Sequence, residues 1–148
     1  LYTHENGPNN GQPLGAAPVA MDSYIQSAFM DIADGEFYML TKRVIPDVDF
    51  TASETSNPVT GATLVPAVDM AVAVTKFPGA ATQTTDVGGT TLTRNIVTAT
   101  GTIDQYTNQV FIRARGRQMN FKISSDTLGT QWQLGDARVD AKPAGLRG

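Results

Sequence analysis

The chain has 148 residues and a formal net charge of −3, with 41% hydrophobic and 17% charged residues, no cysteine and a single histidine. This length predicts one domain, and the lack of cysteine excludes disulfides and thiolate metal sites. The sequence has no run of about 18 apolar residues, so we expect no membrane anchor.

Charge is distributed unevenly along the chain. Residues 1–74 hold two basic and nine acidic groups, a net charge of −7, whereas residues 75–148 hold nine basic and five acidic groups, a net charge of +4. Two interpretations stay open. Oppositely charged strands could be neighbours within a sheet, or the surface could be polarised for stacking against copies of the same chain.

The first 20 residues have the composition of an arm, with three glycines, three prolines and three asparagines. Such a composition is typical of turns and linkers. An ordered arm of this kind would have to lie against its own domain or against a neighbour. We therefore expect an extended arm over residues 1–20 and a β-rich domain over residues 21–148.

Residues 21–50 predict a β-hairpin. The segment 21–30 is moderately apolar, and residues 31–35 have the composition of a turn. Residues 36–44 are rich in aromatic and β-branched side chains, which favour a strand, and Pro46 ends it.

The middle of the chain predicts alternating loops and strands. A polar loop is expected over residues 51–66. Residues 68–75 predict a strand with two apolar faces, so we expect it to be buried on both sides or covered by another subunit. The residues 78–91, rich in Thr, Gly and Ala, predict an exposed loop, and residues 91–105 predict a further strand.

The longest predicted strand covers residues 108–125. One parity of this strand contains Phe111, Arg113, Arg115 and Arg117, but the bulky apolar residues that follow Gly116 fall on the same parity. One face cannot be both charged and part of the core. We therefore expect a bulge or a tight turn at Gly116.

Two short strands are predicted over residues 131–134 and 137–141, and residues 143–148 are expected to form a tail. Strand patterns thus dominate every part of the chain after the arm. The predicted fold is all-β, an antiparallel β-sandwich-like domain with an extended N-terminal arm.

Catalytic chemistry finds little support in the sequence. His4 is the only histidine and lies in the arm, so a Ser-His-Asp triad would require the arm to dock beside a serine. No spacing singles out a pair of carboxylates for glycoside hydrolysis. Asp31, Asp34 and Glu36 match a calcium loop only in part, and a capped turn explains them more simply. We expect no enzyme activity, no metal and no cofactor.

Arg113, Arg115 and Arg117 are the only concentrated basic feature. They could form a solvated strand face paired with acidic residues of the first half. They could also form a docking strip for carboxylates of a neighbouring subunit, because the planar guanidinium binds carboxylates at two points. Binding to DNA phosphates is a third interpretation.

Trp132 is the single tryptophan of the chain. Its simplest interpretation is an anchor in the core or in an interface, because aromatic side chains contribute much of the buried area there. The predicted subunit interface contains one aromatic and four basic residues: Arg113, Arg115, Arg117, Trp132 and Arg138.

Several segments, taken together and in order, resemble the C-terminal region of large tail proteins of short-tailed bacteriophages, the tail nozzle or packaged-DNA stabilisation class. They are YTHENG (residues 2–7), SYIQS (23–27), DIADG (31–35), RVIPD (43–47), RARGRQM (113–119) and GTQWQLGDARVD (129–140). The arginine-glycine-arginine segment and the tryptophan segment are the more specific ones. Residues 51–105 match only as a generic region of strands and loops, and residues 78–91 have no counterpart in the family.

The resemblance implies a virion structural protein of the tail, assembled in the cytoplasm of the bacterial host. It implies that the chain is the C-terminal part of a longer polypeptide that begins with a β-propeller. It further implies a ring of identical subunits, six-fold, around an axial channel below the portal and adaptor proteins. Such a ring would extend the DNA conduit, help to retain packaged DNA and let it pass without sequence-specific binding.

Three other classes of function remain as alternatives. A capsid decoration or head-completion protein would belong to the same virion but bind elsewhere on it. A carbohydrate- or receptor-binding β-sandwich should show an exposed aromatic cleft. A hydrolase, which ranks last, should show two carboxylates that converge in a pocket.

Overall fold

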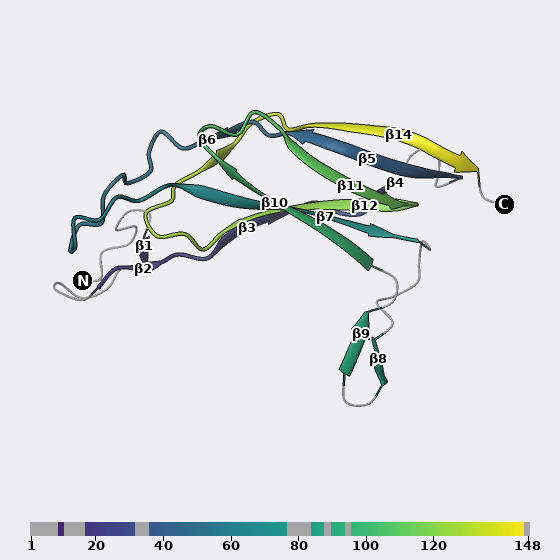
Figure 1. Cartoon of the computed structure of the whole chain (residues 1–148), viewed down its shortest axis with the longest axis horizontal. Coiled ribbons are helices and arrows are strands. Elements are labelled where there is room, and N and C mark those ends of the chain that lie inside the picture. Colours follow the sequence, from purple (N-terminus) through teal and green to yellow (C-terminus); the bar gives the residue numbers. More distant parts are fainter. Residues whose placement is uncertain are drawn as a thin grey trace.

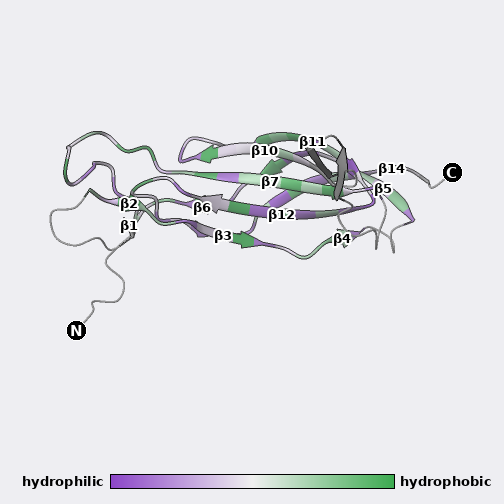
Figure 2. Ribbon diagram, turned by 90° about the horizontal axis from the view of Figure 1, so that it is seen from below, coloured by the Kyte–Doolittle hydropathy of each residue, from purple (hydrophilic) through white to green (hydrophobic). Residues whose placement is uncertain are grey.

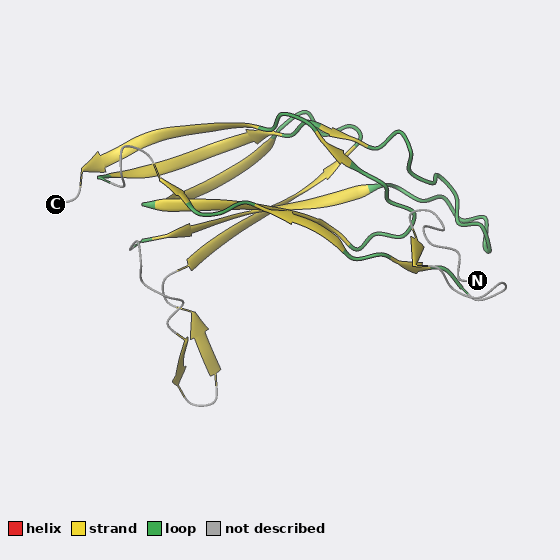
Figure 3. Ribbon diagram, turned by 180° about the vertical axis from the view of Figure 1, so that it is seen from behind, coloured by secondary structure: helices red, strands yellow, loops and turns green. Residues whose placement is uncertain are grey.

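The computed structural model describes residues 9–10, 17–31, 36–76, 84–87, 90–93 and 96–146, and these residues form strands, turns and loops without a helix (Figure 3). The strands are β1 (Asn9–Asn10), β2 (Val19–Ala20), β3 (Ser23–Gln26), β4 (Met30–Asp31), β5 (Phe37–Ile45), β6 (Val48–Asp49), β7 (Ala67–Thr75), β8 (Thr84–Val87), β9 (Thr90–Thr93), β10 (Ile96–Asp104), β11 (Val110–Gly116), β12 (Gln118–Ser125), β13 (Gln133–Leu134) and β14 (Arg138–Leu146).

Two antiparallel sheets face each other and enclose the core (Figure 1). The first sheet has the order β10-β7-β12-β3, and β4 also pairs with β12. The second sheet has the order β11-β5-β14. The prediction of an all-β, antiparallel, sandwich-like domain is therefore confirmed.

The core lies between β7 of the first sheet and β5 and β11 of the second. On β7, every second side chain points inward, and Val68, Met70, Val72 and Val74 are at most 1% exposed. The hydroxyl of Thr41 on β5, itself buried, lies 3.5 Å from the sulfur of a methionine on β12 and so links the two sheets. Hydrophilic and hydrophobic residues alternate along β12, as Figure 2 shows.

The outer side of β7 differs in part from the prediction of two apolar faces. It carries the exposed Asp69 and the half-buried Ala71 and Ala73. The small alanine side chains make the strand apolar on both sides without making both sides part of the core. Only the inner side of β7 is thus fully buried.

The predicted strand over residues 108–125 is two strands in two different sheets. β11 pairs with β5 in the second sheet, and β12 pairs with β7 in the first sheet. The change of phase at Gly116 is confirmed, but its cause is the passage of the chain from one sheet to the other. At this crossing the amide of Arg117 donates a hydrogen bond to the carbonyl oxygen of Thr75 at 2.7 Å.

The predicted hairpin over residues 21–50 is wrong. β3 and β4 pair with β12 in the first sheet, whereas β5 occupies the centre of the second sheet. β5 buries Met39, Thr41 and Val44 and can therefore fill a central position, whereas the short β3 is largely exposed and lies at an edge. The turn expected at residues 31–35 lies outside the described residues apart from residue 31.

Two smaller predictions also need correction. Within the predicted loop 78–91, β8 forms an antiparallel pair with β9, because threonine and valine favour strands on either side of Gly88 and Gly89. The predicted tail begins too early, since residues 143–146 continue β14 against β5. In the predicted arm, β1 pairs with β2, and the other residues before residue 17 lie outside the described part.

Candidate functional site

The second sheet is strongly basic. Its strands β5, β11 and β14 contain six basic residues and one acidic residue, Asp140, which gives them a net charge of +5. Burial alternates at every residue of β11, so Ile112 and Ala114 face the core while the odd-numbered residues 111, 113 and 115 are exposed. The arginines of β11 therefore point away from the core.

Arginines of the neighbouring strands lie on the same outer side. Arg138 of β14 pairs with Ile45 of β5, which follows the buried Val44 and is exposed. We define the basic face as the outer side of this sheet, represented by five residues: Arg43, Phe111, Arg113, Arg115 and Arg138.

Phe111 stands out on the basic face because its side chain is 74% exposed. It is paired with Arg43 of β5 and shares its strand side with Arg113. Interaction surfaces are enriched in aromatic residues and arginine. The sequence already placed Phe111 on the parity of the arginines, but the predicted interface did not include it.

The arginines of the basic face differ in their contacts. The Nη2 atom of Arg115 donates a hydrogen bond to the carbonyl oxygen of Ala144 at 2.9 Å, and its Cζ atom lies 4.9 Å from the ring centroid of Tyr38. Arg115 therefore connects all three strands of the sheet. In the part of the chain that the structure describes, the side chain of Arg113 has no hydrogen bond or ion pair.

One acidic residue does pair with an arginine of this face. The Nε atom of Arg43 lies 3.4 Å from the Oδ2 atom of Asp140, and its Nη1 atom donates a hydrogen bond to Gln109 at 3.3 Å. This ion pair joins neighbouring strands, but both strands have a net positive charge, so it differs from the pairing of oppositely charged strands in the first interpretation of the charge pattern. Arg113 and Arg115 of β11 do not take part in this ion pair, and their exposed side chains lie on the solvent side of the sheet.

The other two residues of the predicted interface lie elsewhere. Arg117 is half-buried at the crossing between the sheets. Trp132 is half-buried against the core, and its Nε1 atom donates a hydrogen bond to the Oγ atom of Ser23 at 3.0 Å. The structure thus brings Arg113, Arg115 and Arg138 onto one sheet face, and their role in an interface stays a prediction.

The first sheet has the opposite charge on its outer side. Its strands β3, β4, β7, β10 and β12 contain three acidic residues and one basic residue, a net charge of −2. A hollow of about 230 Å³ opens beside β7 and β12. Three carboxylates line it, those of Asp22, Asp69 and Asp126, together with Lys122, Ser124 and Ser125. Asp69 accepts a hydrogen bond from the hydroxyl of Thr102 at 2.7 Å.

An exposed aromatic residue lies beside this hollow. The ring of Tyr24 is 63% exposed, and the Nζ atom of Lys122 lies 4.9 Å from its centroid. We define the acidic face as this outer side of the first sheet, represented by Asp22, Tyr24, Asp69 and Asp126. No pattern in the sequence joined these residues, because three separate segments of the chain contribute them.

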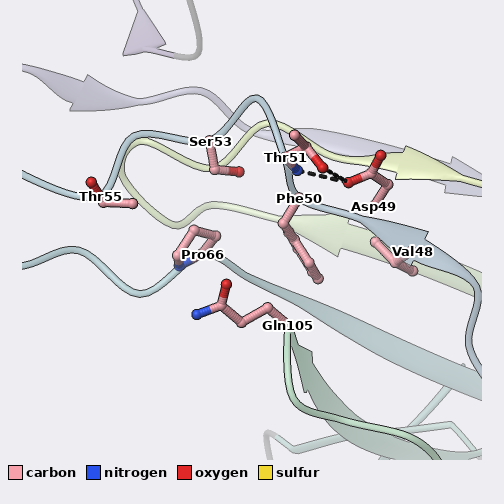
Figure 4. A pocket seen from close by; sticks show the side chains of 8 residues that line it. All are labelled: Val48, Asp49, Phe50, Thr51, Ser53, Thr55, Pro66 and Gln105. Atoms are coloured by element: carbon pink, nitrogen blue, oxygen red, sulfur yellow. Dashed lines mark hydrogen bonds between the residues drawn. The ribbon is translucent and has the colours of Figure 1, made fainter.

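A second hollow, of about 280 Å³, lies between the loop after β6 and the turn after β10 (Figure 4). Its lining is Val48, Asp49, Phe50, Thr51, Ser53, Thr55, Pro66 and Gln105. The amide and hydroxyl of Thr51 donate hydrogen bonds to the carboxylate of Asp49, which holds the pKa of that carboxyl below its usual value. The hydroxyl of Ser53 donates to the carbonyl oxygen of Gln131 at 2.7 Å. A single ionised carboxylate and an engaged serine give this hollow no acid-base pair.

Neither metal-binding chemistry nor a membrane-crossing helix emerges from the described part of the chain. Among those residues, no three histidine, cysteine, aspartate or glutamate side chains gather as metal ligands. None of them belongs to a helix with the length and hydropathy needed to cross a bilayer. Asp34 of the partial calcium motif and His4 lie outside the described residues.

Comparison with models of protein families, with curated proteins and with solved structures finds no match for this chain. The class that the geometry itself supports is a β-sandwich with two outer faces of opposite charge. Its assignment to a phage tail remains a hypothesis that rests on the resemblance of short sequence segments.

Proposed function

We propose that this chain is a structural protein of a bacteriophage virion, a component of the tail nozzle that forms a ring around the DNA conduit. The observation that carries the proposal is the opposite charge of the two outer sheet faces. A protein with one basic and one acidic face can bind copies of itself in a head-to-tail manner, and such contacts form a ring when the angle between copies closes it. The assignment to the tail rests on the resemblance of the arginine and tryptophan segments to tail nozzle proteins.

The distribution of charge also suits a conduit. DNA binds basic surfaces through its phosphates and would be held back by a basic channel wall. Packing of the basic face against a neighbouring copy would remove its arginines from the channel. The ring, with six copies, would then help to retain packaged DNA below the portal and adaptor proteins and let it pass at ejection without sequence-specific binding.

The position of this protein in the virion can be tested by native mass spectrometry of gently dissociated particles. We expect a polypeptide that contains this sequence, in a six-fold ring bound to the portal. A 15.7 kDa species released in many copies with the capsid shell would instead identify a decoration protein and refute the tail assignment.

A further inference from the structure

Among the described residues, no segment covers either outer sheet face, and the side chains of the two faces are complementary. The basic face has Arg113 and Arg138 exposed beside Phe111. The acidic face has exposed carboxylates beside an exposed ring, that of Tyr24. Each face therefore offers an aromatic side chain among charges that are mostly of one sign. The exceptions are Lys122, which lies against the ring of Tyr24, and Asp140, which pairs with Arg43.

We infer that the basic face of one copy docks on the acidic face of a second copy, with Arg113 against the carboxylates of Asp69 and Asp126. This inference rests on the proposed function and names the contact that would build its ring. Phe111 and Tyr24 supply apolar area at the contact, and the arginines supply charge-assisted hydrogen bonds.

A contact between two identical faces is disfavoured by the same charges. Two basic faces would bring strands of net charge +5 together, and like charges across an interface are repulsive. The two faces lie on opposite sides of the core, so they cannot meet within one copy (Figure 1). Head-to-tail docking is the arrangement that pairs opposite charges.

The size of the faces predicts a weak contact between two isolated copies. A nine-residue strand is about 30 Å long, and three strands side by side are about 14 Å wide. The resulting area of about 400 Å² for each copy is roughly half of the ~800 Å² that each partner buries in a standard stable interface. We expect association at concentrations of about 10 to 1,000 μM that weakens as salt is added.

Two single substitutions test the docking by sedimentation velocity of the whole chain at low salt. Arg113→Glu alters the basic face, and Asp126→Lys alters the acidic face. In the described part of the chain neither side chain has a hydrogen bond or ion pair, so both variants should keep the melting temperature of the parent protein. Each should weaken self-association by at least about tenfold, because it places like charges opposite each other.

Matched controls carry the same changes of charge away from the two faces. Lys76→Glu lies beyond the end of β7, and Asp136→Lys lies in the loop before β14; both positions are exposed. These controls should associate like the parent protein. An equal loss in a control would show that only the net charge matters and would overturn the inference.

The decisive sample is an equimolar mixture of the Arg113→Glu and Asp126→Lys variants. The first keeps its acidic face and the second keeps its basic face, so the mixture should recover a contact with the affinity of the parent contact. Absence of this recovery would overturn head-to-tail docking. A different pair of results would overturn the inference. If Arg113→Glu lowers binding to duplex DNA while Asp126→Lys leaves self-association unchanged, the basic face binds DNA and not a second copy.

The result can be separated from the test of the proposed function. A parent chain that stays monomeric up to about 1 mM at low salt, although virions place it in a tail ring, would overturn the docking and leave the function standing. Recovery in the mixture, for a protein that mass spectrometry finds on the capsid, would support the docking and refute the proposed function.

Discussion

Gly116 marks the place where the chain passes between the two sheets, and Gly116→Ala should strongly destabilise the fold. A methyl group at this buried residue would lie 2.7 Å from the carbonyl oxygen of Thr75 and 2.7 Å from the Cβ atom of Val74. Ordinary contacts between such atoms are about 3.5 to 4.0 Å, so the overlap approaches 1 Å. Both neighbours belong to β7, the strand at the centre of the core.

The expected loss of stability depends on the atoms of β7 that the added methyl group would displace. Overpacking of a well-packed core costs about 1 to 3 kcal/mol. The shift also strains the hydrogen bond between the amide of Arg117 and the carbonyl oxygen of Thr75, a bond worth about 1 kcal/mol. We therefore expect a loss of about 2 to 4 kcal/mol in the free energy of unfolding.

Urea denaturation followed by the fluorescence of the single tryptophan, Trp132, measures this loss. With a slope of about 2 kcal/mol/M, the midpoint should fall by about 1 to 2 M. Gly61→Asn is the matched control, because Gly61 has a φ of 70° and a Cβ atom there meets nothing within 4 Å. Asparagine tolerates this conformation, so the control should cost less than about 1 kcal/mol. A loss at Gly116 no larger than that of the control would refute the steric argument.

Four further changes test individual contacts, each by chemical denaturation. Thr75→Val should be neutral or stabilising by up to about 1 kcal/mol, because the buried hydroxyl of Thr75 has no partner within the described residues; a clear loss would show that it has one. Hydrogen bonds from neighbouring residues lower the pKa of Asp104 from 3.8, so they stabilise the fold above that pH and are lost as the pH falls below it; Asp104→Ala should reduce stability at pH 6 and flatten the decline at acid pH, and an unchanged decline would contradict this. Trp132→Phe, followed by circular dichroism, should cost about 0.5 to 1.5 kcal/mol through its lost hydrogen bond. Arg115→Gln should cost about 1 kcal/mol through its lost stacking and carbonyl contacts, whereas Arg113→Gln should leave stability unchanged; equal effects would contradict the distinct roles of the two arginines.

Local patterns in the sequence predicted those features that one strand decides by itself. Alternation along residues 110–116 placed the arginines on one side, and the clash of phase located a break at Gly116. These predictions succeed because the side-chain period of a strand is a property of the strand alone.

The same reasoning did not predict which distant strands pair with each other. The hairpin over residues 21–50 looked sound because two strand-like segments flank a turn, but the core decides which strand each of them joins. β12 lies between β7 and β3, and the pairing partners come from segments far apart in the chain. The acidic hollow was missed for the same reason, since its carboxylates come close only once these pairings are formed.

The unequal charge of the two halves of the sequence is a different feature from the unequal charge of the two faces. β5 belongs to the acidic first half yet adds Lys42 and Arg43 to the basic sheet, and Asp126 belongs to the basic second half yet lines the acidic hollow. The order of the strands therefore separates the basic and the acidic residues onto opposite sides of the core, regardless of the half of the sequence from which they come. Within the described residues the cation-rich sheet contains a single acidic residue, which is paired with Arg43. The remaining arginines of that face can meet carboxylates of the other face only on another copy. A contact of this kind uses two different surfaces, so each added copy presents a new basic face and a new acidic face, and the angle between copies decides whether the chain of copies closes into a ring.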